Sequence, residues 1–182
     1  VPAYFLSALW MPMPGIVYLT VVLAAISQLA GWGWSIAVIM RRRSYLRQQV
    51  HTAPFAIIAL SLVALTIKLL LQMGSTIPSL STLAFGFRPI VIGYLHLVLL
   101  GVVSLFILGY SMSVGLLAET KRAKTGVTVF IAGIILNELA LMVQGATAMG
   151  YVVVPYINET LLGIAVVMFA GVLMLNQPSE SY

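Results

Sequence analysis

Long apolar runs separated by short polar stretches make up most of this chain. A helix needs roughly 20 apolar residues to cross the hydrocarbon core of a bilayer. Backbone amides in hydrocarbon must be hydrogen-bonded within their own segment, so each run is predicted to be helical. The pattern therefore predicts an all-α fold, a polytopic transmembrane helix bundle with five full spans at 15–40, 54–74, 89–117, 127–150 and 161–175.

The stretch before the first span has a different character. It reads VPAYFLSALWMPMP, in which Tyr4 and Trp10 suit the membrane–water interface and two prolines, Pro12 and Pro14, stop a helix. We expect an N-terminal partial or interfacial segment that forms the end of a preceding helix. The whole of 1–182 is then one transmembrane domain, part of a longer chain or a complex.

Composition supports a membrane location and excludes several classes of protein. Apolar residues make up 62% of the chain and charged residues 7%, whereas a soluble domain carries about 25% charge. The lipid bilayer is therefore an expected partner. The net charge of +5 comes from residues in short loops between spans, so no nucleic-acid partner is expected. Because the chain lacks cysteine, thiolate metal ligands are excluded.

The positions of the basic residues predict an orientation. The loops after the first and third spans are rich in Lys and Arg, whereas the loops on the other side contain Arg88. Positively charged loops stay in the cytoplasm. The N-terminus is therefore predicted outside and the C-terminus in the cytoplasm. The cytoplasmic basic residues are Arg41, Arg42, Arg43, Arg47, Lys121, Arg122 and Lys124.

Three ionisable side chains fall inside the predicted spans: Lys68, His96 and Glu138. Such groups are costly in a membrane and mark candidate functional sites. At 1.5 Å per residue, His96 and Lys68 lie roughly 10 Å from the outer ends of their spans. Glu138 lies near mid-membrane. These depths predict a polar site in the outer half of the bilayer, with supporting polar residues Gln144, Asn137 and Tyr94.

Each of these residues also has a structural interpretation. Lys68 could extend its side chain to the headgroups. Glu138 would be protonated, paired with Lys68, or next to a wet cavity, as a proton-handling group or one half of an ion pair. His96 would either donate to a helix carbonyl or act as a cofactor-binding residue, a haem or metal ligand. Tyr94 is better explained as an interfacial anchor.

Small residues predict which helix faces pack. In the third span Gly101, Ser104, Ser111 and Gly115 follow helical spacing on one face, and His96 points about 140° away from it. A comparable face in the fourth span contains Gly133, Asn137, Ala140, Gln144 and Thr147. Both faces are predicted to contact neighbouring helices closely.

Common catalytic motifs are missing from the sequence. It contains no HExxH, GxSxG or Walker loop. Whether the protein is an enzyme therefore stays open, and its catalytic residues are unknown. One membrane histidine is too few for a bis-histidine haem, and one carboxylate is too few for a dinuclear metal site. If His96 is a ligand, its partners come from additional sequence or another subunit.

The stretch IVIGYLHLVLLGVVSLFILGY, together with IKLLLQMGS and FLSALWMPMPG, resembles the C-terminal half of a family of multi-pass bacterial membrane proteins, best represented in Bacteroidetes. That family is distantly similar to the catalytic subunit of haem–copper oxidases. Gly93 to Leu97 is the most specific part of the resemblance. It implies a bacterial inner membrane location and a role for His96 as one of several histidines around a haem or transition metal. The multi-histidine helix of the family is absent here.

Three functions remain open at this point. The first is a haem- or metal-associated component of respiratory type, with His96 as ligand, Glu138 as proton-handling group and Lys68 as its electrostatic partner. The second is a structural or assembly subunit, and the third a channel or transporter component that uses Glu138 and Lys68 along a polar path. In each case other membrane helices, of the same parent chain or another subunit, are expected partners.

Overall fold

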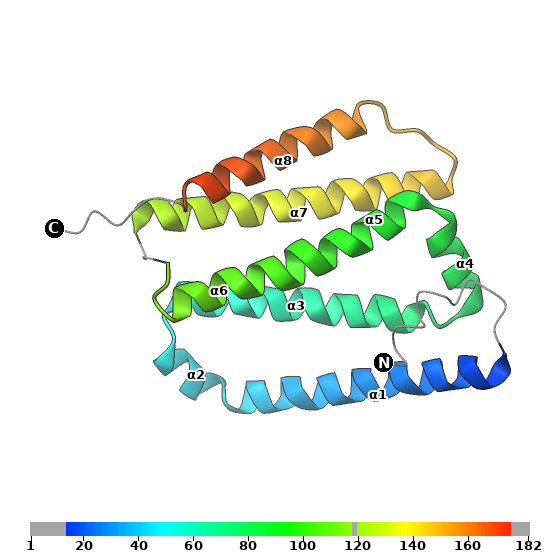
Figure 1. Cartoon of the computed structure of the whole chain (residues 1–182), viewed down its shortest axis with the longest axis horizontal. Coiled ribbons are helices and arrows are strands. Elements are labelled where there is room, and N and C mark those ends of the chain that lie inside the picture. Colours follow the sequence, from blue (N-terminus) through cyan, green and yellow to red (C-terminus); the bar gives the residue numbers. More distant parts are fainter. Residues whose placement is uncertain (1–13, 118–119, 176–182) are drawn as a thin grey trace.

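A computed structural model describes residues 14–117 and 120–175, and helices make up nearly all of this part (Figure 1). No strand occurs in these two ranges. The predicted N-terminal interfacial segment and the polar C-terminal tail lie outside the described residues. The helices are α1 (Gly15–Arg41), α2 (Arg43–Gln49), α3 (Thr52–Gly74), α4 (Pro78–Gly86), α5 (Arg88–His96), η2 (Leu97–Ser104), α6 (Leu105–Ser113), α7 (Lys121–Met149) and α8 (Ile157–Leu173).

The all-α prediction is confirmed, and four helices are long and apolar enough to cross a membrane. These are α1, α3, the continuous helix made by α5, η2 and α6, and α7. The first two agree with the predicted spans to within two residues, but the third helix ends at Ser113 where 117 was predicted, and α7 begins at Lys121, inside the basic loop predicted before 127. The fifth, α8, is apolar but has only 17 residues. The length and composition of these helices are compatible with an integral membrane protein.

Proline and threonine set where several helices begin. Pro54, Pro78 and Pro89 lie in the first turns of α3, α4 and α5, where a missing backbone N–H removes no helical hydrogen bond. Thr120 begins α7, and its hydroxyl accepts a hydrogen bond from the Ala123 amide at 3.1 Å. The surface stretch predicted between the second and third spans contains the short helix α4.

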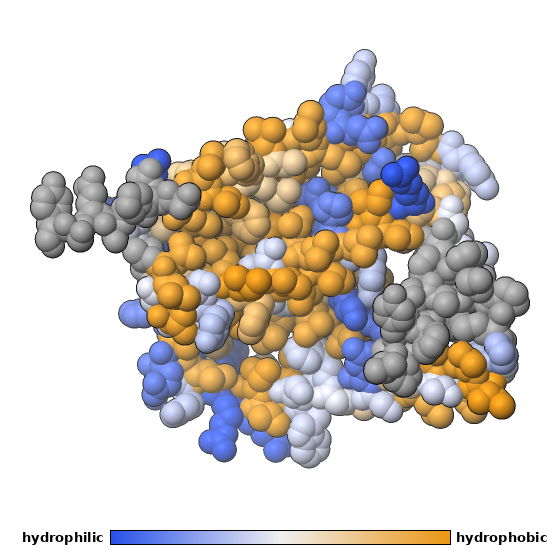
Figure 2. Space-filling view, in the orientation of Figure 1, coloured by the Kyte–Doolittle hydropathy of each residue, from blue (hydrophilic) through white to orange (hydrophobic). Residues whose placement is uncertain are grey.

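The spanning helices lie in an open row (Figure 1). Helix α1 packs on α3, α3 packs on η2 and α6, α5 packs on α7, and α7 packs on α8. The main apolar core lies where the middle helices meet, around Ile57, Leu105 and Ile134. Because each helix contacts few neighbours, large apolar faces stay uncovered by the chain. Figure 2 shows this apolar surface, with hydrophilic groups near the helix ends and a small hydrophilic patch over α7 beside α5.

The third spanning helix contains an eight-residue π-helix, η2, which starts directly after His96. Its wider turn is marked by Ser104, whose hydroxyl donates to the Leu99 carbonyl five residues back at 2.9 Å. This turn shifts the phase of the helix, so the predicted small-residue face is only partly correct. Gly101 is buried, but Gly115 lies exposed beyond α6 with φ +75°. The buried face of α6 consists of Leu105, Leu108, Gly109 and Met112.

A hydroxyl from α3 is bonded to the π-helix. Ser61 is 1% exposed, and its Oγ donates to the Val102 carbonyl at 2.8 Å. We expect Ser61→Ala to lower the free energy of unfolding by about 1 kcal/mol, since it removes a buried hydrogen bond between helices. Reversible unfolding in mixed micelles measures the change. Ser27→Ala is the matched control, because Ser27 is exposed and bonds only within α1; an equal loss in both variants would contradict the assigned role.

Candidate functional site

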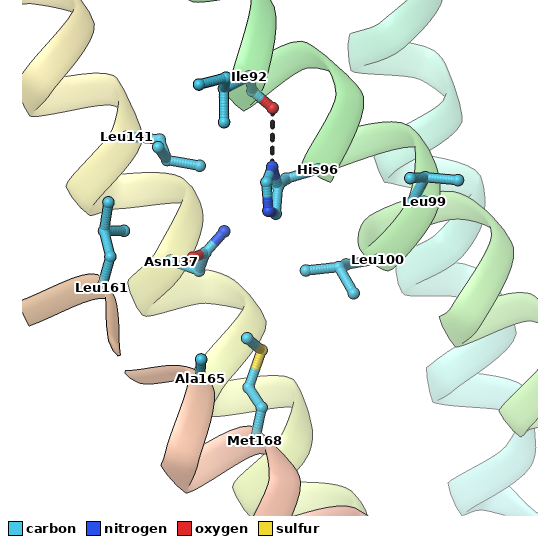
Figure 3. Close-up of a pocket in the computed structure, with 9 residues that line it drawn as sticks. All are labelled: Ile92, His96, Leu99, Leu100, Asn137, Leu141, Leu161, Ala165 and Met168. Carbon is cyan, nitrogen blue, oxygen red and sulfur yellow. Dashed lines mark hydrogen bonds between the residues drawn. The ribbon is translucent and has the colours of Figure 1, made fainter. Parts of the chain in front are cut away.

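A crevice of about 390 Å³ lies between the α5–η2 helix, α7 and α8 (Figure 3). Its walls are mainly apolar, and its polar side chains are His96 and Asn137. Both were predicted site residues, and the fold brings them together from two helices. The complete lining is Ile92, His96, Leu99, Leu100, Asn137, Leu141, Leu161, Ala165 and Met168.

The histidine has one ring nitrogen fixed by its own helix. Nδ1 of His96 lies 2.8 Å from the Ile92 carbonyl oxygen. A carbonyl only accepts hydrogen bonds, so Nδ1 carries a proton, and in the uncharged form of the ring Nε2 carries a lone pair. No protein donor to Nε2 occurs among the described residues. His96 therefore presents a hydrogen-bond acceptor, or ligand atom, to the crevice.

The amide of Asn137 is the second polar group. Its residue is 5% exposed, and within the described ranges its Nδ2 has no hydrogen-bond partner. In Figure 3 the amide points from α7 toward His96. Leaving a buried donor unpaired costs about 1–3 kcal/mol. Among the described residues, the crevice thus contains a donor without a partner, which points toward an acceptor without a partner.

Glu138 follows Asn137 on α7 and is half-buried, without lining the crevice. Its Oε1 is buried and has no hydrogen-bond partner in the described part of the chain. The carboxyl group is close enough to interact with both His96 and the Asn137 side chain, although neither contact has the geometry of a hydrogen bond.

Lys68 lies elsewhere, in a polar chain between α1 and α3. Its ammonium donates to the Gln72 side-chain oxygen, and Gln72 Nε2 donates to Gln28 Oε1 at 3.3 Å. The fold brings His96, Asn137 and Glu138 together, whereas Lys68 contacts Gln72. The pairing of Lys68 with Glu138 stays a prediction.

Tyr94 and Gln144 are half-buried and do not line the crevice. Sequence reasoning placed Asn137 only among the supporting polar residues, although its amide is the buried donor that has no partner among the described residues. It missed Met168, whose side chain packs over Gly133 and lines the crevice. The sequence contained a signal for the side of the crevice formed by α7. Gly133, Asn137 and Leu141 are spaced four residues apart and therefore share one face of the helix.

The donor atoms in the crevice fit a haem in part and a bare metal ion poorly. An imidazole and a thioether, from His96 and Met168, are both axial haem ligands in other proteins. None of the nine lining residues is positively charged, so no lining group would pair with haem propionates. Among the described residues, no group of three His, Cys, Asp or Glu side chains could hold a metal ion.

The π-helix strengthens the assignment of this region as a functional site. Single π-helical segments in membrane and soluble helices occur frequently at such sites, and η2 begins at the residue after His96. Comparisons with protein-family models, curated proteins and solved structures give no match for this chain. The resemblance to a haem-protein family therefore stays a prediction.

Proposed function

We propose that this integral membrane protein binds a neutral, lipid-soluble molecule in the crevice between α5, α7 and α8. The observation that carries this proposal is the buried, unpartnered amide of Asn137 beside the free Nε2 of His96. Buried polar groups are normally paired, and unpaired groups point to a missing partner. A bound molecule supplies that partner.

The chemistry of the two groups defines the polar part of the ligand. Asn137 donates a hydrogen bond and His96 accepts one. A single hydroxyl group satisfies both, because its oxygen accepts from the amide and its proton is donated to the imidazole. The absence of charged side chains from the crevice lining favours a ligand without net charge.

The apolar walls define the rest of the ligand. Leu99 lines the crevice and is 61% exposed on the outer surface of the helix row. In a bilayer such a surface faces acyl chains, so the ligand enters sideways from the lipid. A volume of about 390 Å³ lies within the range of small-molecule sites, roughly 300–1,000 Å³.

A haem bound through His96 is the second candidate function. It is favoured by the lone pair on His96 Nε2 and by the Met168 thioether in the same crevice. A bound haem would supply one-electron chemistry, as expected for a component of respiratory type. His96 would then be held in orientation by its bond to the Ile92 carbonyl.

Organic extraction of the purified protein, with an absorption spectrum of the same sample before and after reduction, tests both candidates. We expect the wild-type protein to yield one non-phospholipid molecule per chain and to show no Soret band. The His96→Leu variant should yield little of this molecule. His51→Leu is the matched control, because His51 lies in the basic loop region before α3. A Soret band that shifts on reduction would replace the first candidate with haem. A featureless spectrum with no extracted ligand would leave the structural or transport functions.

We propose further that α8 is a fifth span, with the N-terminus outside the cytoplasm in a bacterial inner membrane. Because the chain has no cysteine, single cysteines report the side of the membrane. Glu159→Cys should react with an impermeant maleimide in intact cells. Tyr45→Cys and a cysteine added at the C-terminus should react only after permeabilisation. Labelling of the C-terminal cysteine in intact cells would show that α8 does not cross.

A further inference from the structure

We infer that the ligand is a hydroquinone with a lipid tail, and that the site prefers it to the oxidised quinone. This inference rests on the proposed function and names the ligand class of the same crevice. It follows from two features of the site: the opposed donor and acceptor, and the opening toward lipid.

The donor and acceptor distinguish the two oxidation states. A hydroquinone hydroxyl accepts from Asn137 Nδ2 and donates to His96 Nε2, so both groups are paired. A quinone carbonyl oxygen only accepts. It pairs the Asn137 amide and leaves the His96 nitrogen without a donor. The reduced form therefore gains one hydrogen bond over the oxidised form.

The imidazole acceptor of His96 favours a phenolic hydroxyl over an aliphatic alcohol. A phenol is much more acidic than an alkanol, so its proton is shared more strongly with an imidazole. A sterol or diacylglycerol hydroxyl would gain little from this arrangement.

The shape of the crevice accommodates a ring with a tail. The polar pair lies inside the crevice, and the exposed Leu99 lies at its edge. A substituted six-membered ring fits in the volume of about 390 Å³, and its tail continues into the bilayer. Met168 lines the same space, and thioethers pack favourably on aromatic rings.

Anaerobic equilibrium dialysis of the detergent-purified full chain tests the inference, with tetramethylhydroquinone and tetramethylbenzoquinone as probes. We expect the reduced probe to bind roughly tenfold more tightly, the effect of one buried hydrogen bond. His96→Leu should remove this preference, while His51→Leu keeps it. His96→Gln, which restores an acceptor oxygen, should recover part of it and guards against a variant that fails to fold.

Equal affinity for the two probes, tighter binding of the quinone, or no binding of either probe would overturn the hydroquinone assignment. The proposed function would survive those results if organic extraction still recovers a different neutral lipid that is lost in His96→Leu. If extraction recovers nothing and neither probe binds, both proposals fail.

Discussion

Asn137→Leu is expected to stabilise the ligand-free protein by about 1–3 kcal/mol and to abolish ligand binding. Leucine keeps the branching of asparagine at Cγ, its larger side chain can extend into the adjoining crevice, and it removes a buried donor that has no partner in the described chain. Most substitutions of a residue that is 5% exposed destabilise a protein, so a gain is diagnostic. It would show that the amide is kept for a ligand and not for folding.

Unfolding of the extracted, ligand-free protein in mixed micelles measures the first effect, and dialysis with tetramethylhydroquinone measures the second. Gln144→Leu is the matched control. It replaces another amide on α7 that lies outside the crevice, and it should leave binding unchanged. A clear loss of stability in Asn137→Leu, with ligand binding retained, would mean that the amide has a structural role.

Gly171→Leu should be strongly destabilising, lowering the free energy of unfolding by about 3 kcal/mol or more. A Cβ atom at Gly171 would lie 2.9 Å from the Gly126 carbonyl oxygen and 2.9 Å from the Phe130 amide nitrogen. These are backbone atoms of α7 and cannot move independently. Helix α8 would have to separate from α7, and the crevice would lose the wall formed by Leu161, Ala165 and Met168.

Gly163→Leu provides the control on the same helix. A Cβ atom at Gly163 meets nothing within 4 Å. The free energy of unfolding of this variant should therefore lie within about 0.5 kcal/mol of the wild-type value, as for other surface substitutions. Ligand extraction from both variants tests the second consequence. Wild-type stability and ligand content in Gly171→Leu would contradict the close α7–α8 contact.

The helices could be predicted from the sequence because their signals are long and local. The apolar runs at 15–40 and 54–74 exceed the length of most buried soluble helices, and proline marks the start of the second. The fifth run, at 161–175, is close to the minimum length for a span. Its helix is correspondingly short, and whether it crosses the membrane stays a prediction.

The π-helix η2 could not be predicted, because it depends on contacts between helices. A hydroxyl on α3 bonds to the Val102 carbonyl, and the extra residue per turn changes which side of α6 is buried. Ordinary helical spacing therefore assigned Gly115 to a packing face, although it lies in the exposed turn after α6.

The candidate site could be predicted in part. His96 and Glu138 were identifiable because ionisable groups are rare in spans. Similar depth suggested that Lys68 belonged with them, but depth says nothing about which helices are neighbours. Lys68 faces a glutamine on its own helix, four residues away. The significance of Asn137 was not visible in the sequence, because it depends on the side-chain amide having no hydrogen-bond partner among the described residues.

The most direct test of the central claim is a cryo-EM structure of the full chain in lipid nanodiscs, bound to a rigid antibody fragment. We predict density for a non-protein molecule within hydrogen-bond distance of both His96 Nε2 and Asn137 Nδ2, continuing outward past Leu99. Density for an acyl chain alone, with the Asn137 amide turned to another protein group, would contradict a ligand site in this crevice.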